Sequence, residues 1–490
     1  MKLYIKIITL SIYISGLLMA LGCESILEEE NKSQLSPDNL LTSELGITTV
    51  IANAYSSLNA GNPTRNFVKR EEMTSDILWQ TGGGENGTAV SLIGFLWDSN
   101  ATLEAFDWGI YWNVIRDANT VLDNIENVGD ISDSKKQNLI AEARFLRVQA
   151  YYILWIQYGT LPLRTSLSDP QQLARSSEEE FKTFMETEFL EAIPNLPEPG
   201  NESNYGRVNS GGAKGLLCKW YLNTKQWQKC VDVANDIIIG DKYSLVPSYF
   251  DLFALENERN AEFMLVSTKL ANENNYISLT ATTLPPGYKV GLDGGLENAV
   301  NTTWSNYASQ YRLLDDFYNS FESGDTRNSR ILTSYVNGND VQINLLSIPN
   351  NTRAMKYPPD PAAQGSGHGN DFPIVRFADI LLAKAEALNE ISGPTQESVD
   401  LINMIRNRAE LGNKLLSDFP TKESLGDHIL DERRWEFWYE GHRRTDLLRM
   451  GKFIESAISR GYSAQEKHKL FPIPQGEIDA NKLMVQNPGY

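Results

Sequence analysis

Apolar residues recur at spacings of three and four over most of the chain, and this spacing predicts amphipathic helices. The first predicted helix follows the start signal Ser36-Pro37-Asp38 and would bury Leu41, Leu45, Thr48, Ala52 and Tyr55. A second is predicted from about Thr102 to Ile125 and a third from about Ser132 to Gln157. The same periodicity predicts helices over residues 178–192, 210–223, 226–239, 373–390, 396–410, 422–440 and 443–459.

Short polar breaks separate several of these helices, such as Asn223-Thr224-Lys225 and Ser392-Gly393-Pro394. Breaks of this length join helices into antiparallel pairs, which stack as in tetratricopeptide-type arrays. No repeat of about 34 residues is visible, so the comparison concerns architecture only. We expect a mainly α protein in which residues 39–490 form one scaffold.

Two zones lack this periodicity. Residues 247–369 are rich in Gly, Pro, Asn, Ser and Thr and alternate only briefly, at Phe263–Ser267 and Val341–Leu346, so loops and a few short strands are predicted there. Gly61–Asn100 is also predicted to be loop-rich, and its glycines at 82–84 lack the Lys-Ser/Thr ending of a phosphate-binding loop. Long loops in a compact protein are often binding surfaces.

Both zones contain aromatic residues among polar neighbours, namely Trp79, Trp97, Tyr288, Trp304 and Tyr307. Flat rings offer apolar faces to the C–H faces of sugars, while amides and carboxylates bond the hydroxyls. Ordinary core packing is the alternative for each ring taken singly. The strongest candidate for sugar binding combines the Trp97 ring with the Asn100 amide, within one turn of each other. Asp76 is a candidate to accept hydrogen bonds from sugar hydroxyls. We assign Trp108 and Trp112, which lie in a helical pattern, to the core.

The amino terminus has the form of a secretory leader. Lys2 and Lys6 precede the apolar run Ile7–Leu21, which suits a signal-peptide core better than a membrane span. The run ends at Gly22-Cys23, so residues 1–22 are predicted to be a lipoprotein signal peptide and Cys23 the acylated amino terminus. An ordinary leader with an incidental cysteine is the alternative. Residues 23–38, acidic and polar, are predicted to be a flexible tether.

Charge excludes one class of partner. Lys and Arg total 44 against 63 Asp and Glu, a net charge of -19, so long-range repulsion argues against nucleic acid as a partner. Cys218 and Cys230 lie within helical patterns and are interpreted as buried thiols, a disulfide being the alternative. No cluster has zinc-like or EF-hand spacing, so no metal and no cofactor are predicted. The four histidines are far apart and no catalytic motif is present, so we expect no enzyme.

The most ordered charge pattern runs from Ile429 to Gly451. Glu432, Glu436 and Glu440 recur every four residues, and arginines fall three or four positions from a glutamate, where helical side chains meet. Aromatic residues between them would bury much of this cluster. A desolvated carboxylate–guanidinium network usually fixes one arrangement of packed helices rather than performing chemistry. Pairing with this cluster is also the favoured role of His442.

The same segment resembles the carboxy-terminal signature of the SusD/RagB family, E-R-x-x-E-F-x-x-E-G-x-R-x-x-D-L-x-R-x-G. Other blocks of the chain agree with that family in order: Ala141–Arg147, Tyr158–Leu163, Gly206–Val208, Asp371–Leu382, Ala385–Ala387, Asn403–Ala409, Leu470–Pro474 and Gln486–Tyr490. Each block is weak alone, and their joint order covers nearly the whole chain.

The resemblance implies a SusD-like scaffold of tetratricopeptide-like helix pairs with a loop-rich, ligand-binding insertion. It further implies a lipid-anchored protein of the outer membrane, facing the exterior, that captures a glycan and passes it to a SusC-like TonB-dependent transporter. In glycan-binding members an aromatic arc comes from loops at about the positions of Trp97, Asn100, Tyr288 and Trp304. Some relatives take peptides, so peptide capture is one alternative. A structural accessory of the transporter, without its own ligand, is another.

Overall fold

The computed structural model describes residues 40–490 apart from 81–85, 100–101, 291–303 and 305–309. The predicted leader, Cys23 and the tether therefore lie outside the described residues, as do Asn100 and Tyr307. None of the helices in the described ranges combines the length and apolar character needed to cross a membrane.

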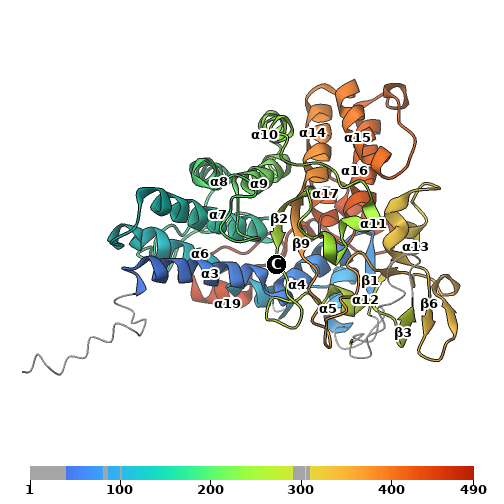
Figure 1. The fold of residues 1–490 in the computed structure, drawn as a ribbon, viewed down its shortest axis with the longest axis horizontal. Coiled ribbons are helices and arrows are strands. Elements are labelled where there is room, and N and C mark those ends of the chain that lie inside the picture. The colour runs from blue at the N-terminus through green and yellow to red at the C-terminus, as the bar shows by residue number, and fades with distance from the viewer. Residues whose placement is uncertain (1–39, 81–85, 100–101, 291–303, 305–309) are drawn as a thin grey trace, which may run out of the picture.

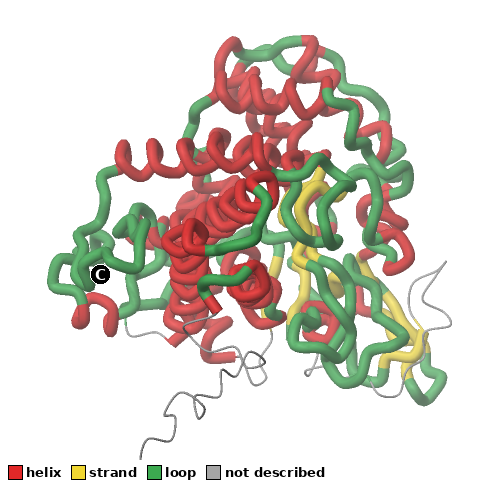
Figure 2. The backbone as a smooth tube through the Cα atoms, turned by 60° about the vertical axis from the view of Figure 1, so that its left-hand side comes forward, coloured by secondary structure: helices red, strands yellow, loops and turns green. Residues whose placement is uncertain are grey.

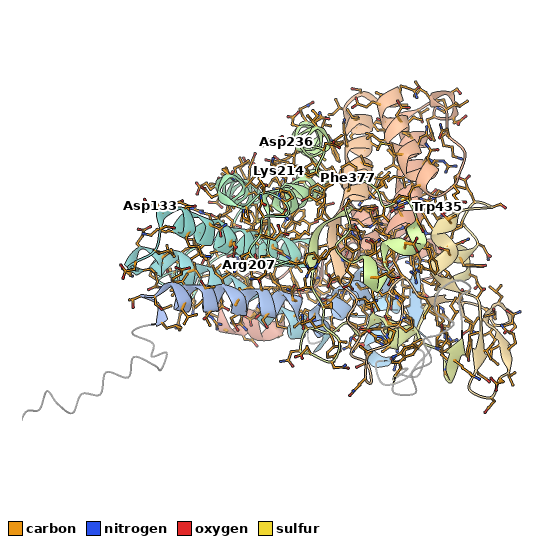
Figure 3. All side chains as sticks on the ribbon, in the orientation of Figure 1. Asp133, Arg207, Lys214, Asp236, Phe377 and Trp435 are labelled. Carbon is orange, nitrogen blue, oxygen red and sulfur yellow. The ribbon has the colours of Figure 1, made fainter. Side chains whose placement is uncertain are left out.

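The fold is mainly α, as predicted, and neighbouring helices pack in chain order (Figure 1). The second long helix packs against both the first and the third, and the later helices continue as pairs. One such pair is α9 (Ser210–Asn223) and α10 (Trp227–Ile239), which an ion pair of 2.6 Å between Lys214 and Asp236 joins at the surface (Figure 3). The scaffold helices are α3 (Glu44–Asn59), α6 (Thr102–Asn124), α7 (Asp133–Tyr158), α8 (Glu178–Ala192), α9 (Ser210–Asn223), α10 (Trp227–Ile239), α14 (Phe377–Ser392), α15 (Gln396–Arg408) and α16 (Lys422–Phe437).

Local capping explains where these helices begin. Ser177 caps α8 in a full capping box with Glu180, and Ser132 caps α7. The first described long helix starts at Glu44 behind Ser43, whose side chain accepts a hydrogen bond from the Gly46 amide. The predicted inner face was wrong in part: Leu41 and Tyr55 pack against the core as predicted, but Leu45 does not. Leu45 is 67% exposed, and the buried face carries Ile47, Ile51, Ala54 and Leu58.

The described residues within 247–369 form loops, short helices and short strands, as predicted (Figure 1), and the strands gather on one side of the helical scaffold (Figure 2). Their strands pair with each other and with two strands from outside this range, and all pairings between the named strands are antiparallel. The pairs are β1 (Leu78–Gln80) with β4 (Tyr311–Leu313), β2 (Phe263–Ser267) with β9 (Phe372–Arg376), β5 (Ile331–Leu332) with β8 (Arg353–Ala354), and the three-stranded order β3 (Tyr288–Val290), β6 (Ser334–Asn337), β7 (Gln342–Asn344).

Several predicted boundaries need correction. The zone 61–100 is largely helical, the helix predicted from 373 is preceded by strand β9, and the helix predicted over 443–459 is broken in two. The elements concerned are α4 (Gly61–Met73), α5 (Asn86–Gly94), α17 (Arg443–Arg449) and α18 (Phe453–Ser459). The remaining short helices are α11 (Tyr249–Leu252), α12 (Leu279–Thr283), α13 (Asp315–Tyr318) and α19 (Gln475–Ala480).

The signature segment turns sharply between α16 and α17. Tyr439 and Gly441 have φ angles of 64° and 77°, in the left-handed region. A Cβ on Gly441 would lie 2.7 Å from the Phe67 ring, so both conformation and space require glycine there. Because of this turn, the predicted ion pairs within one helix do not form. The three glutamates pair with arginines from elsewhere in the chain, whereas Arg433 and Arg449 also pair with Asp446 inside the segment.

Arg376, at the end of β9, is the centre of the resulting network. Its guanidinium donates two hydrogen bonds to Glu440, at 2.8 and 2.9 Å, and one to Glu262 at 2.7 Å, and it also bonds Glu436. Arg408 pairs with Glu436 and Glu262 from the other side. All five side chains are buried. The network therefore joins α15, α16 and β9, which confirms that the signature is structural.

His442 lies at the edge of this network. Its Nδ1 is 3.5 Å from Lys219 Nζ and 3.7 Å from Asp379, and its ring stacks on Phe437. Burial and the neighbouring Lys219 lower its pKa to about 3, against the opposite effect of Asp379 and Glu440. The imidazole is therefore neutral in the folded protein at neutral pH.

A fall in stability on acidification is expected from this histidine. Histidine in an unfolded chain has a pKa of about 6.5, so the unfolded state binds a proton at this residue below that pH. The folded state binds it only below about pH 3. Stability is therefore lost as pH falls through this window. Urea unfolding at several pH values should show a shallower decline in His442→Asn than in the native chain. Identical slopes would contradict the assignment.

Cys218 and Cys230 are buried free thiols with their sulfur atoms 3.7 Å apart, as interpreted from the helical pattern. Their contact joins α9 to α10.

Candidate functional site

Trp97 does not face solvent, and the expectation that its ring binds ligand was wrong in this respect. Only 2% of the residue is exposed. Its ring contacts Phe95, His468 and Phe471, and its Nε1 donates a 2.7 Å hydrogen bond to the Tyr490 hydroxyl. Trp97 therefore fastens the carboxy-terminal segment to the scaffold, and neither ring face is free for a sugar.

Trp97→Ala is expected to destabilise the fold without removing a ligand contact. Loss of a buried tryptophan costs about 3–5 kcal/mol, because the cavity is refilled only in part. Urea unfolding should show this loss, while the affinity for a glycan, measured where the variant is still folded, should stay within about twofold. A selective loss of affinity with unchanged stability would contradict the structural role.

Asp76 is likewise occupied by the fold. Arg443 donates to both of its carboxylate oxygens, at 2.7 and 2.9 Å, and Arg434 lies 3.2 Å away. Burial alone would raise the pKa of Asp76, but the two arginines hold it well below its usual range. We therefore correct the prediction that Asp76 accepts hydrogen bonds from a sugar.

Tyr288 and Trp304 are brought together, although 16 positions separate them in the sequence. Both are half-buried and pack against one small apolar cluster in the loop-rich layer, which also includes Tyr335. Tyr288 stacks on Tyr335 with ring centroids 6.1 Å apart, and Trp304 donates through Nε1 to the Asp360 carbonyl at 3.0 Å. This cluster is separate from the main core. The rings of Tyr288 and Trp304 are therefore partly exposed and are held in place by the residues of this small cluster.

Trp79 lies on the β1–β4 ribbon. It is paired with Arg312, and directly opposite residues of an antiparallel pair share one face. Their neighbours on the strands, Leu78, Gln80, Tyr311 and Leu313, are buried, whereas Trp79 and Arg312 are half-buried. Trp79 also donates through Nε1 to the Asn350 carbonyl at 2.7 Å. The ring is thus held by the segment that leads into β8.

Arg353, the first residue of β8, lies between the segment that holds Trp79 and the stacked pair Tyr288 and Tyr335. Its Nη2 donates a 3.0 Å hydrogen bond to Asn351, the residue after the one that holds Trp79. β4 packs against β8, with the Leu313 amide bonded to the Thr352 carbonyl at 3.0 Å. Burial, together with repulsion from Arg312, lowers the pKa of Arg353 to about 9, and nearby Tyr335 acts against this. The two arginines and Tyr335 are therefore neighbours.

We call this set the aromatic–arginine surface; it comprises Trp79, Tyr288, Trp304, Arg312, Tyr335 and Arg353. Trp79, Tyr288, Trp304 and Arg312 are its half-buried members, and Tyr335 and Arg353 are buried beside them. Rings beside guanidinium donors are a combination suited to a polar, ring-shaped ligand. Sequence reasoning found three of these residues and missed Arg312, Tyr335 and Arg353. Strands of two to four residues give too little alternation to predict which side chains share a face.

The scaffold also encloses an apolar cavity of about 80 Å³ between α4, α7, α9, β9 and α17. Tyr152, Ile156, Leu216, Phe372 and His442 are among its lining residues. It lies beside the signature network rather than at the aromatic–arginine surface.

Comparison with protein families gives two matches. The model described as "SusD family" matches residues 241–490, and one described as "Starch-binding associating with outer membrane" matches residues 26–222. Similar curated proteins include SusD-like protein P25 of Formosa agariphila, 24% identical with 99% of this chain and 100% of the relative covered. Starch-binding protein SusD of Bacteroides thetaiotaomicron is 23% identical, with 86% and 85% covered.

Solved structures share the fold. A laminarin-binding SusD-like protein superposes with a TM-score of 0.77 at 22% identity, covering 92% of this chain and all of the other. Surface glycan-binding protein A of Bacteroides thetaiotaomicron, in complex with laminarihexaose, gives 0.74 at 21% identity, covering 91% of this chain and all of the other. The family match from residue 241 to the carboxy terminus spans half of the chain, and its relatives extend along nearly all of it. The chain therefore belongs to the SusD family.

Proposed function

We propose that this protein captures an oligosaccharide or polysaccharide at the cell surface and delivers it to a SusC-like TonB-dependent transporter of the outer membrane. The observation that carries the proposal is the aromatic–arginine surface, where Tyr288 and Trp304 share one support and Trp79 lies on the adjoining ribbon. Sugars stack on such half-exposed rings. The starch, laminarin and laminarihexaose in the descriptions of relatives support a glycan as the ligand class.

The proposed role is binding without catalysis. Four carboxylates of the signature segment are bound by buried cations, as Glu440 is by Arg376 and Lys356, so these four are not free to act as an acid and base pair. They are Glu432, Glu436, Glu440 and Asp446. Membrane attachment is proposed to depend on Cys23, which becomes the acylated amino terminus of the mature chain. A Cys23→Ala variant should no longer incorporate radioactive palmitate in growing cells, and continued labelling would contradict the anchor.

A glycan array tests the ligand class. The leaderless chain, starting after Cys23, is applied to immobilised polysaccharides, oligosaccharides and peptides. Saturable binding to at least one glycan, lost in Trp304→Ala, is expected. Saturable binding to peptides alone would establish peptide capture instead. Binding to nothing, with the transporter still copurifying from membranes, would favour a structural accessory.

A further inference from the structure

Arg353 differs from the buried arginines of the signature network. Those arginines pair with carboxylates, as Arg376 does with Glu440 and Arg433 with Asp379. Arg353 is only 2% exposed, yet its Nε and Nη1 have no hydrogen-bond partner among the described residues. Within the described ranges, the one hydrogen bond of its guanidinium goes to the neutral amide oxygen of Asn351. No carboxylate lies within ion-pair distance of it in the described part of the chain.

Arg312, on the adjoining strand β4, also lacks a counter-charge among the described residues. Its Nε is buried without a partner among the described residues, and no ion pair is formed there by its guanidinium. The Leu313–Thr352 backbone hydrogen bond of 3.0 Å fixes the two arginine-bearing strands side by side. Two guanidinium groups therefore lie close together in a chain whose net charge is -19. Trp79 lies on the same face as Arg312.

Two adjacent, unneutralised guanidinium groups are unfavourable for folding, because each loses hydration without gaining a counter-charge. Groups that break a stabilising rule in this way are expected at functional sites. A guanidinium donates through a planar fork that matches the two oxygens of a carboxylate or sulfate. The missing partner thus has the chemistry of an oxyanion.

We propose that Arg312 and Arg353 bind an anionic substituent of the captured glycan, the carboxylate of a uronic acid or a sulfate ester, next to the rings of Trp79 and Tyr335. This inference rests on the proposed function and specifies its substrate class. Because the whole chain repels polyanions at long range, such binding comes from the local arginine pair and weakens with added salt.

Calorimetric titration with three ligands tests the inference: an oligogalacturonate, a sulfated galactan oligosaccharide and a neutral laminari-oligosaccharide. We expect one acidic ligand to bind at least about tenfold more tightly than the neutral one, since charged hydrogen bonds dominate such a site. Which of the two binds identifies carboxylate or sulfate as the group recognised. Arg353→Gln and Arg312→Gln should each reduce that affinity about tenfold or more.

Lys214→Gln is the matched control. It removes one positive charge on α9, in the helical scaffold (Figure 3), and should leave the affinity unchanged. Aromatic-dependent binding of the neutral ligand alone, unaffected by either arginine substitution, would overturn the inference and leave the proposed function standing. Failure of all three ligands and of the glycan array would overturn both.

Stability supplies an independent test. Arg353→Met keeps most of the length of the side chain and removes an uncompensated charge. In the absence of ligand, the Tm of this variant should therefore be no lower than that of the native chain, and up to about 2–4 °C higher. A gain in Tm together with loss of the acidic ligand is what a ligand-binding arginine predicts. A clear fall in Tm would show that Arg353 already has a counter-charge within the protein, and would overturn the inference.

Discussion

Replacing Arg376 by alanine is expected to lower the free energy of unfolding by about 3–5 kcal/mol, a loss comparable to that expected for Trp97→Ala. The substitution leaves Glu262, Glu436 and Glu440 buried with part of their counter-charge gone. Burial of these carboxylates is tolerated only because guanidinium groups from other elements contact them. Urea unfolding followed by circular dichroism measures the loss.

Lys214→Ala is the control for this prediction, since it removes a half-exposed ion pair with Asp236. Such surface pairs contribute about 0–1 kcal/mol. If Arg376→Ala were no more destabilising than Lys214→Ala, the network would not hold α15, α16 and β9 together, and our structural interpretation of the signature would fail.

The second large effect is expected on binding. Replacing Tyr288 and Trp304 together by alanine should weaken glycan affinity by about 30-fold or more, because the loss of even one central aromatic anchor costs about 2 kcal/mol or more at such sites. Both rings are half-buried on a cluster that is separate from the main core, so the fold should remain. Isothermal titration with the glycan identified on the array gives the affinity, and thermal unfolding confirms that the variant is folded.

Trp227→Ala provides a matched aromatic control. Trp227 is a partly buried ring at the start of α10, in the helical scaffold. Its removal should change stability and leave affinity unaltered. Equal losses of affinity in both variants would indicate a general effect of destabilisation rather than a site at Tyr288 and Trp304.

Much of the scaffold was predictable because its helices carry local signals. α8 and α9 have the predicted bounds, and each begins behind a capping residue, Ser177 and Asn209. α4 was missed because its sequence is polar: Lys69, Arg70, Glu71 and Glu72 are all buried by packing against distant segments. Arg70, for instance, is neutralised by Asp107 at 2.6 Å. Periodicity of apolar residues does not reveal a helix whose buried face is charged.

The candidate site was predictable only in part. Loop composition placed Tyr288, Trp304 and Trp79 outside the scaffold, and the structure assembles them with Tyr335 and two arginines. Trp97 has equally polar neighbours, yet Phe471 and Tyr490 bury it from the far end of the chain. Contacts between residues so distant in sequence leave no local pattern. The binding role of each ring therefore stays a prediction, while the burial of Trp97 is a property of the fold.

Amide hydrogen exchange with and without the glycan tests the location of the ligand most directly, because it needs no substitution. Binding at the aromatic–arginine surface predicts slower exchange in β3, β6 and the segment 348–354, with the scaffold helices unchanged. Slowing confined to α7, α9 and α17, which line the apolar cavity, would place the ligand inside the scaffold and contradict the account.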